Sequence, residues 1–349
     1  MRLERWLRRA LRPWLLAALV ASAASACAGA DATAPGADPC AGGPGTGVRA
    51  SLTAGLNVWA VLPASTDACI TQRLDSHFVY RSADVGPTGR LFVFLPGTDA
   101  IAQHYQLILA HAARNGYHAI GLNYPNQASM ATLCAGLPST CYGDARLELL
   151  TGQPVSSALS VDRANSVDNR LIKLLRYMRA TESAGNWSQF LIGDTAVAWS
   201  KVSIAGHSQG GGQALFIAQR HFVYRATAYA SYGDGLGTVA SVAPWVTRPY
   251  ATPVTRLFGL ISTFDELVSP TTALAVWSAI GMGTALVDVD ITAEPYGLSQ
   301  RFITAFTPAN RTLAIGPNHN VVVVDANTPR FGSQVPVFGT VWRALSFPP

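Results

Sequence analysis

A serine flanked by closely spaced glycines is the first feature of the sequence that suggests chemistry. The stretch Gly206-His207-Ser208-Gln209-Gly210 follows a run with strand character (201–205) and precedes a run with helix character (210–220). A G-x-S-x-G motif between a strand and a helix is typical of a nucleophile elbow, a turn so tight that glycines are needed beside the serine. The N-terminus of the following helix favours a developing negative charge. The pattern therefore predicts that Ser208 is a nucleophile held at the end of a strand.

A serine hydroxyl at neutral pH needs a base within hydrogen-bond reach. In chains with a nucleophile elbow, this base follows the serine in the sequence. Of the seven histidines, five precede the serine: His77, His104, His111, His118 and His207. His221 ends the helix that starts beside the serine, too far along to turn back. His319 remains, in a turn-rich loop (316–320) directly after an apolar run, and it is the predicted base.

The third residue needed is a carboxylate that fixes the tautomer of the imidazole and stabilises the imidazolium. It should lie between Ser208 and His319 in the sequence, at the end of a strand. Asp265 follows the apolar run 257–262 and is the predicted acid. Asp234, in the turn after the preceding strand, is the main alternative, and Glu266 is the second.

Attack of the serine on a carbonyl creates an oxyanion that needs two preorganised N–H donors, and loss of one donor typically costs about 10²- to 10³-fold in rate. One donor is the backbone of the residue after the nucleophile, Gln209. The second should come from the loop after the apolar run 91–95, where Pro96-Gly97-Thr98-Asp99 stands. Because Gly97 allows a close approach of the backbone, the Thr98 N–H is the predicted second donor.

The elements that must position these residues follow an α/β pattern, in which short β-branched or aromatic runs alternate with helical stretches. The clearest helix is predicted over 161–178, where apolar residues recur every three or four positions. Continuous apolar strands are typical of a mostly parallel sheet covered by helices on both faces, with ligands beyond the carboxyl ends of the strands. The predicted strands are 56–62, 77–81, 91–95, 118–123, 201–205, 226–231, 256–262 and 312–315.

With these residues in place, the stretch from about Phe78 to Phe347 resembles the α/β-hydrolase superfamily, and residues 206–211 are similar to the elbow of its secreted esterases and lipases. The resemblance implies a mostly parallel central sheet of about eight strands, an acyl-enzyme intermediate and no cofactor. The chain departs from many lipases in its oxyanion loop, where Pro96-Gly97 replaces their His-Gly.

The leading hypothesis is hydrolysis of a carboxylic ester, in a small molecule or a polymer. Peptide, thioester or acyl-transfer chemistry would use the same three residues. A hydrolase-like binding protein without catalysis is the alternative from another class, and the retained serine, late histidine and intervening acid argue against it. The glycines after Gly210 lack the Gly-Lys-Ser/Thr of a phosphate loop, so no nucleotide cofactor is expected.

The first 26 of the 349 residues have the Arg-rich start, short apolar run and small-residue end of a secretory signal peptide. We therefore expect an exported protein, periplasmic or extracellular, in which 27–47 is a disordered linker and 48–349 is the catalytic domain. Cys27 follows Ala24-Ser25-Ala26 and would carry a lipid anchor if the leader is a lipoprotein signal; cleavage by signal peptidase I is equally consistent. The leader holds much of the net charge of +5, and no basic run with aromatics remains, which argues against nucleic acid as a partner.

Four further cysteines remain for an oxidising compartment. Cys134 and Cys141 are close enough in sequence to close one loop, and Cys40 with Cys69 would tie the N-terminal segment to the domain. No C-x-x-C pair supports a zinc site. The segment 127–160, which contains the first pair, is much longer than usual connections and is predicted to form part of the wall of an acyl pocket.

Overall fold

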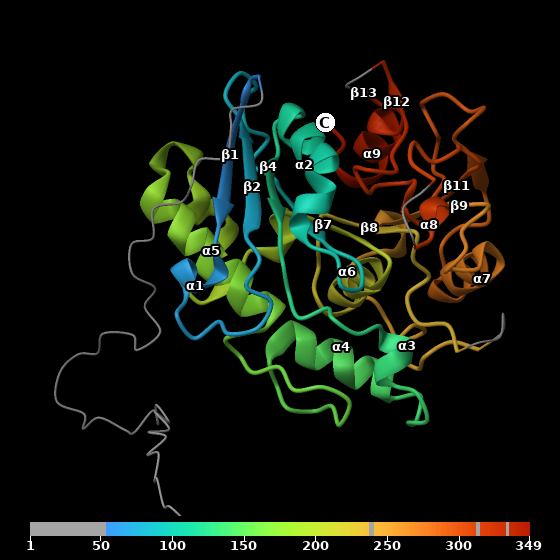
Figure 1. The fold of residues 1–349 in the computed structure, drawn as a ribbon, viewed down its shortest axis with the longest axis horizontal. Helices are drawn as coiled ribbons and strands as arrows, with labels where there is room; N and C mark the ends of the chain where they lie inside the picture. The colour runs from blue at the N-terminus through green and yellow to red at the C-terminus, as the bar shows by residue number, and fades with distance from the viewer. Residues whose placement is uncertain (1–53, 237–240, 312–314, 333–334) are drawn as a thin grey trace, which may run out of the picture. The chain divides into compact units, whose positions relative to one another are not determined.

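A computed structural model describes residues 54–236, 241–311, 315–332 and 335–349 (Figure 1). Its described part contains one sheet of nine strands, in the spatial order β1-β2-β4-β3-β7-β8-β9-β11-β10. The strands are β1 (Leu56–Val61), β2 (His77–Ser82), β3 (Leu91–Leu95), β4 (His118–Gly121), β7 (Val202–His207), β8 (Arg225–Tyr229), β9 (Leu257–Ser262), β10 (Leu286–Asp288) and β11 (Arg301–Thr304). β2 pairs antiparallel with both of its neighbours, and all other neighbouring strands are parallel. The predicted α/β class with a mostly parallel central sheet is confirmed.

Helices and two small ribbons complete the described fold. The helices are α1 (Pro63–Thr66), α2 (Gln106–Arg114), α3 (Met130–Leu133), α4 (Cys141–Thr151), α5 (Val167–Thr181), α6 (Gln209–Arg220), α7 (Pro270–Ile280), α8 (Pro317–Asn320) and α9 (Gly339–Ser346). Short 3₁₀ turns are η1 (Ala102–Tyr105), η2 (Ser183–Gly185), η3 (Trp187–Phe190), η4 (Trp199–Lys201) and η5 (Val254–Arg256). The ribbons pair β5 (Leu191–Ile192) with β6 (Ala196–Val197), and β12 (Arg330–Phe331) with β13 (Val335–Pro336).

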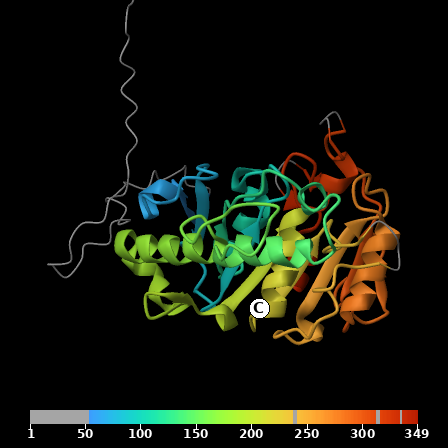
Figure 2. The same cartoon turned by 90° about the horizontal axis from the view of Figure 1, so that it is seen from below.

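Both faces of the sheet are buried, as the continuous apolar runs predict. In β3 the side chains alternate between two hydrophobic clusters: Leu91, Val93 and Leu95 belong to one, and Phe92 and Phe94 to the other. Helices α5, α6 and α7 contribute to the first cluster, and α2 and α9, which contact each other, contribute to the second. Figure 2 shows α4 and α5, drawn in green to lime, in front of the strands. Because helices cover both faces of the sheet, the loops at the ends of the strands remain as the place for functional residues.

Seven of the eight predicted strands are confirmed within two residues at each end. The eighth, 312–315, lies outside the described residues except for its last position. Strand β11 was not predicted, because Arg301 and Thr304 interrupt its apolar pattern. In the structure it lies between β9 and β10 and pairs with both. No strand was predicted at β10 either.

The predicted helix over 161–178 is wrong at its start, because α5 begins at Val167. Ser166 is the N-cap, and its side chain accepts a hydrogen bond from the Asn169 N–H. The residues before it form a turn in which Asp162 accepts from the Asn165 backbone N–H at 2.9 Å. The N-cap at Ser166 therefore decides where α5 begins, although the apolar spacing predicted an earlier start.

The long segment 127–160 is not a continuous loop, because it contains the helices α3 and α4. A disulfide joins Cys134 to Cys141, with 5.7 Å between the Cα atoms, as predicted. Glu148, which is buried in α4, accepts hydrogen bonds from the Ser156 and Val161 N–H groups and so holds the chain that follows the helix.

The remaining predictions on the N-terminal part lie largely outside the described residues. These include the leader 1–26, the linker 27–47, the lipid-anchor residue Cys27 and the start of the domain at 48. Cys69 takes part in a disulfide, and its predicted partner, Cys40, is outside the described residues too. None of the described helices combines the length and apolar character needed to cross a bilayer.

Candidate active site

Ser208 stands at the sharp turn between β7 and α6. Its backbone has φ 53° and ψ −119°, a conformation that costs a residue with a side chain of order 1–3 kcal/mol. Packing around the turn requires the flanking glycines: a Cβ at position 206 would lie 2.2 Å from the carbonyl carbon of Gly210, and one at position 210 would lie 2.1 Å from the Leu95 oxygen. The residues around Ser208 thus have the geometry that the motif predicts for an elbow.

His319 lies in α8 with only 3% of its surface exposed, and Asp265 holds its ring. The two carboxylate oxygens of Asp265 are 2.9 and 3.0 Å from His319 Nδ1. Because a carboxylate only accepts, Nδ1 carries the proton, and Nε2 is left as the acceptor. The backbone N–H groups of Leu267 and Val268 donate to Asp265 Oδ1 at 2.9 and 2.8 Å and fix the orientation of the carboxylate. The structure therefore brings together the predicted base and the predicted acid.

The main alternative acid, Asp234, has different partners. Its oxygens accept from Arg146 at 2.5 and 2.6 Å and from Trp245 Nε1 at 2.6 Å. Asp234 and Arg146 are 2% and 1% exposed, so this is a buried ion pair. No sequence pattern had indicated Arg146, because the pair joins residues 88 positions apart.

Glu266, the second alternative, binds the backbone that carries His319, and none of its described hydrogen bonds goes to the ring. Its carboxylate accepts from the N–H groups of Asn318 and His319 at 3.1 and 3.0 Å, and from Asn318 Nδ2 at 2.6 Å. Partial burial opposes ionisation, but these hydrogen bonds outweigh it and lower the pKa of Glu266 below its usual value. Glu266 therefore anchors the loop of the predicted base.

The predicted oxyanion loop lies against the elbow. A Cβ on Gly97 would be 2.9 Å from His207 Nδ1 and 3.3 Å from the Ser208 Cβ, so a side chain at this position would require the elbow to shift. The Gly97 N–H donates to the Tyr105 hydroxyl at 3.1 Å, and Thr98 Oγ1 donates to Gln209 Oε1 at 2.8 Å. Among the contacts of the described chain, the Thr98 N–H has no acceptor. The Gln209 N–H is the first of α6 and has no partner within the helix.

A pocket of about 680 Å³ joins these groups, since Ser208, His319, Thr98 and Gln209 all line it. The described contacts include no hydrogen bond between the side chains of Ser208 and His319; such bonds are often long before a ligand binds. Segment 127–160 supplies part of the wall through Ser129, Met130, Ala131, Tyr142 and Arg146. That the pocket binds an acyl group stays a prediction. Leu267, Val268 and Ile315 supply an apolar part of the lining on the His319 side.

Sequence reasoning considered His207 only as a base and missed its place in the site. Because a carbonyl oxygen only accepts, His207 Nε2 donates to the His319 carbonyl oxygen at 3.2 Å. Nδ1 of the neutral ring is then the acceptor for the Tyr105 hydroxyl, 3.1 Å away, while that hydroxyl accepts from the Gly97 N–H. Burial, together with the nearby His319, lowers the pKa of His207 well below its usual value, so the ring stays neutral. The only signal for this role was its position directly before the serine.

Within the described ranges, no three His, Cys, Asp or Glu side chains gather in a way that could hold a metal ion. Comparison of the sequence with protein-family models gives no match, and comparison with curated proteins gives none.

Proposed function

We propose that the chain is an α/β-hydrolase that cleaves carboxylic esters through an acyl-enzyme intermediate. The observation that carries this proposal is the pair formed by His319 and Asp265, held at 2.9 and 3.0 Å in the same pocket as a serine on a strained elbow. A binding protein has no need of an oriented imidazole, whose Nε2 has no partner among the described contacts, in the same pocket as such a serine. The N–H groups of Thr98 and Gln209, for which the described contacts show no acceptor, add the electrostatic part of the site.

The geometry supports the following reaction. His319 Nε2 takes the proton of the Ser208 hydroxyl while Oγ attacks the ester carbonyl, and Asp265 stabilises the imidazolium. The carbonyl electrons move to the oxyanion, which accepts from the Thr98 and Gln209 N–H groups. Collapse breaks the bond to the alcohol, which leaves with the proton from His319. Water, deprotonated by the same histidine, then attacks the acyl-enzyme; the bond to Ser208 Oγ breaks, Oγ takes the proton from His319, and the acid is released.

The substrate proposal follows from the lining of the pocket. Leu267, Val268, Ile315, Met130 and Ala131 offer apolar surface to an acyl chain or to the apolar part of a polymer. We propose export to the periplasm or the extracellular space, with Cys27 as the residue for a lipid anchor. The disulfide between Cys134 and Cys141 is consistent with that environment.

Hydrolysis of p-nitrophenyl esters of increasing acyl length, together with labelling by a fluorophosphonate probe, tests the proposal. Ser208→Ala should abolish both turnover and labelling while the melting temperature stays near that of the wild type. The matched control is Ser231→Ala, because Ser231 lines the same pocket and is 3% exposed, and none of the described hydrogen bonds joins it to His319. This control should retain activity.

Parallel assays on thioesters, peptides and acyl transfer to an alcohol distinguish the reactions that share the mechanism. A wild-type protein that hydrolyses none of these substrates and does not react with the probe at Ser208 would contradict the proposal. Binding of an ester without turnover would then favour the non-catalytic alternative.

A further inference from the structure

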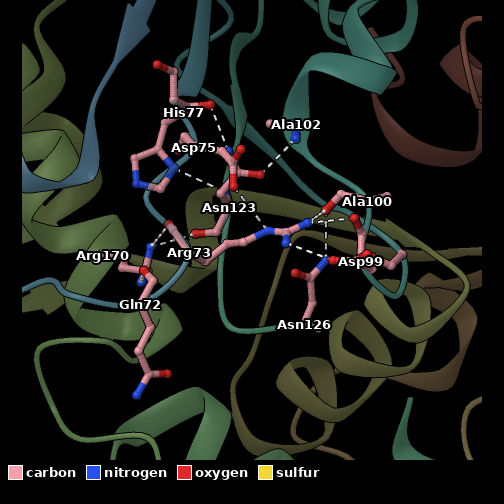
Figure 3. A network of polar contacts seen from close by, with 12 residues as sticks. Gln72, Arg73, Asp75, His77, Asp99, Ala100, Ala102, Asn123, Asn126 and Arg170 are labelled. Atoms are coloured by element: carbon pink, nitrogen blue, oxygen red, sulfur yellow. Dashed lines mark hydrogen bonds and ion pairs between the residues drawn. The ribbon is translucent and has the colours of Figure 1, made fainter. Parts of the chain in front are cut away.

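The loop after β3 is clamped by residues from two other parts of the chain (Figure 3). Asn126, which follows β4, makes three of the bonds. Its side-chain Nδ2 donates to the carbonyl oxygens of Gly97 at 2.5 Å and Ala100 at 2.9 Å, and its own carbonyl accepts from the Asp99 N–H at 2.9 Å. Asn126 is 1% exposed, so these bonds form away from water.

Arg73, which precedes β2, holds the end of the same loop. Its Nη2 donates to the carbonyl oxygens of Asp99 at 2.7 Å and Ala100 at 2.8 Å, and its Nη1 pairs with the Asp99 carboxylate at 2.9 Å. Asp99 has a φ of 54°, which is unfavourable for a residue other than glycine and is maintained by this set of contacts. The carbonyls of the loop are thus directed toward Asn126 and Arg73.

The direction of the Gly97 carbonyl determines the direction of the next N–H. A trans peptide is planar, and its C=O and N–H point in opposite directions. The Gly97 oxygen accepts from Asn126 Nδ2 at 2.5 Å and from the Ala100 N–H at 3.1 Å, and Asn126 is not among the residues that line the pocket. The Thr98 N–H of the same peptide therefore points the other way, toward the side of the loop that lines the pocket with Ser208.

We propose that Asn126 is a positioning residue that aims the Thr98 N–H at the oxyanion. The inference rests on the proposed function. The Gly97 N–H is already used by the Tyr105 hydroxyl, so Thr98 is the donor that this loop has available. The role of the Asn126 side chain is donation, because its Oδ1 is buried and has no hydrogen-bond partner in the described part of the chain. Two carbonyl acceptors within 2.9 Å identify which amide atom is the nitrogen.

The first test compares Asn126→Ala with Asn169→Ala. Asn169 is the matched control, because it is also buried and its Nδ2 also donates to a backbone carbonyl, that of Ala164, but it lies in α5 outside the pocket. Asn126→Ala should lower kcat by about 10- to 100-fold, less than the 10²- to 10³-fold for outright loss of a donor, with KM within about twofold. Binding of phenylboronic acid, which becomes tetrahedral on the serine, should weaken by the same factor as kcat/KM.

Equal effects of the two alanine variants on kcat would overturn the proposal, as would weaker boronate binding that does not follow kcat/KM. A purely structural role predicts the first of these results, since both variants lose a buried hydrogen bond.

The second test uses Asn126→Asp and the pH. When protonated, the carboxyl group has one O–H that can donate to the Gly97 oxygen; when ionised, it only accepts and repels both carbonyls. Burial raises the pKa of such a carboxyl group, and the guanidinium of Arg73, which donates to the same Ala100 oxygen at 2.8 Å, opposes that shift. The ratio of kcat for Asn126→Asp to kcat for the wild type should rise as the pH falls. The effect of acid on the histidine base is common to both proteins and cancels, so a ratio independent of pH would contradict the proposal.

A measurement on the wild type keeps the test decisive if neither variant folds. In the ¹⁵N-labelled protein, the Thr98 and Gln209 amide protons should both move downfield when phenylboronic acid forms its adduct with Ser208. Movement of Gln209 alone would overturn the role of Thr98 and therefore that of Asn126, while leaving the ester hydrolase in place. A wild type without esterase activity and without an adduct would overturn the proposed function itself.

Discussion

Asparagine substitution at Asp234 and at Asp265 should separate a structural acid from a catalytic one. Asp234→Asn removes the charge that compensates Arg146, in a pair whose members are 2% and 1% exposed. Breaking a buried pair in this way costs about 3–5 kcal/mol, because one charge is left buried and uncompensated. At about 2–4 °C per kcal/mol for a domain of this size, the melting temperature should fall on the order of 10 °C. Activity per folded molecule should change little, since the described hydrogen bonds of the Asp234 side chain go to Arg146 and Trp245 and none goes to His319.

Asp265→Asn should show the opposite pattern. The amide can present its NH₂ group to His319 Nδ1, which favours the tautomer with the proton on Nε2. The value of kcat should therefore fall by about 10⁴-fold, while the melting temperature should change little. The assay is steady-state hydrolysis of a p-nitrophenyl ester beside a thermal melt of each variant.

A control removes both charges near Asp234 at once. Arg146→Met combined with Asp234→Leu replaces the pair by apolar groups and should recover most of the lost stability. The reasoning is refuted if Asp234→Asn keeps the wild-type melting temperature and loses as much kcat as Asp265→Asn.

Three further outcomes are expected. Replacing Cys134 and Cys141 by serine should alter KM or acyl-length preference more than stability, because the bridge closes a short loop worth about 2.5 kcal/mol at most; unchanged preference across an ester panel would dismiss the role of the segment in the pocket. Ser208→Gly should be more stable than Ser208→Ala by about 1 kcal/mol in urea unfolding, because glycine adopts the φ of 53° without strain; equal midpoints would mean that the elbow stores no strain. Burial raises the pKa of Asp325 to about 7, so the folded state binds a proton that the unfolded state has released, and stability should fall as the pH rises from about 4 to 7. Asp325→Asn should flatten that part of the stability profile, and a slope equal to that of the wild type would contradict the assignment.

The local sequence predicted those features that depend on neighbours along the chain. Apolar runs such as 91–95 identified buried strands, and the glycines around Ser208 identified the turn, because a side chain at Gly206 would collide with Gly210, only four residues along the chain. The order of serine, acid and histidine was expected from the chain order typical of chains with a nucleophile elbow, and the strand ends at one edge of a parallel sheet indicated where these residues should lie. The elbow geometry and the pairing of His319 with Asp265 agree with these expectations; the catalytic roles stay predictions.

Other features depend on contacts between distant segments, and only the tertiary structure decided them. Asp234 and Asp265 follow neighbouring strands and look alike in sequence, but Asp234 meets Arg146 from α4, and Asp265 meets His319. The clamp of Asn126 on the Gly97 carbonyl joins the loops after two paired strands. The sequence determined which side chains with suitable chemistry stand at strand ends, because that information is local. Which of them meet was decided by packing, since a hydrogen bond between residues 29 or 88 positions apart leaves no periodic trace in the chain.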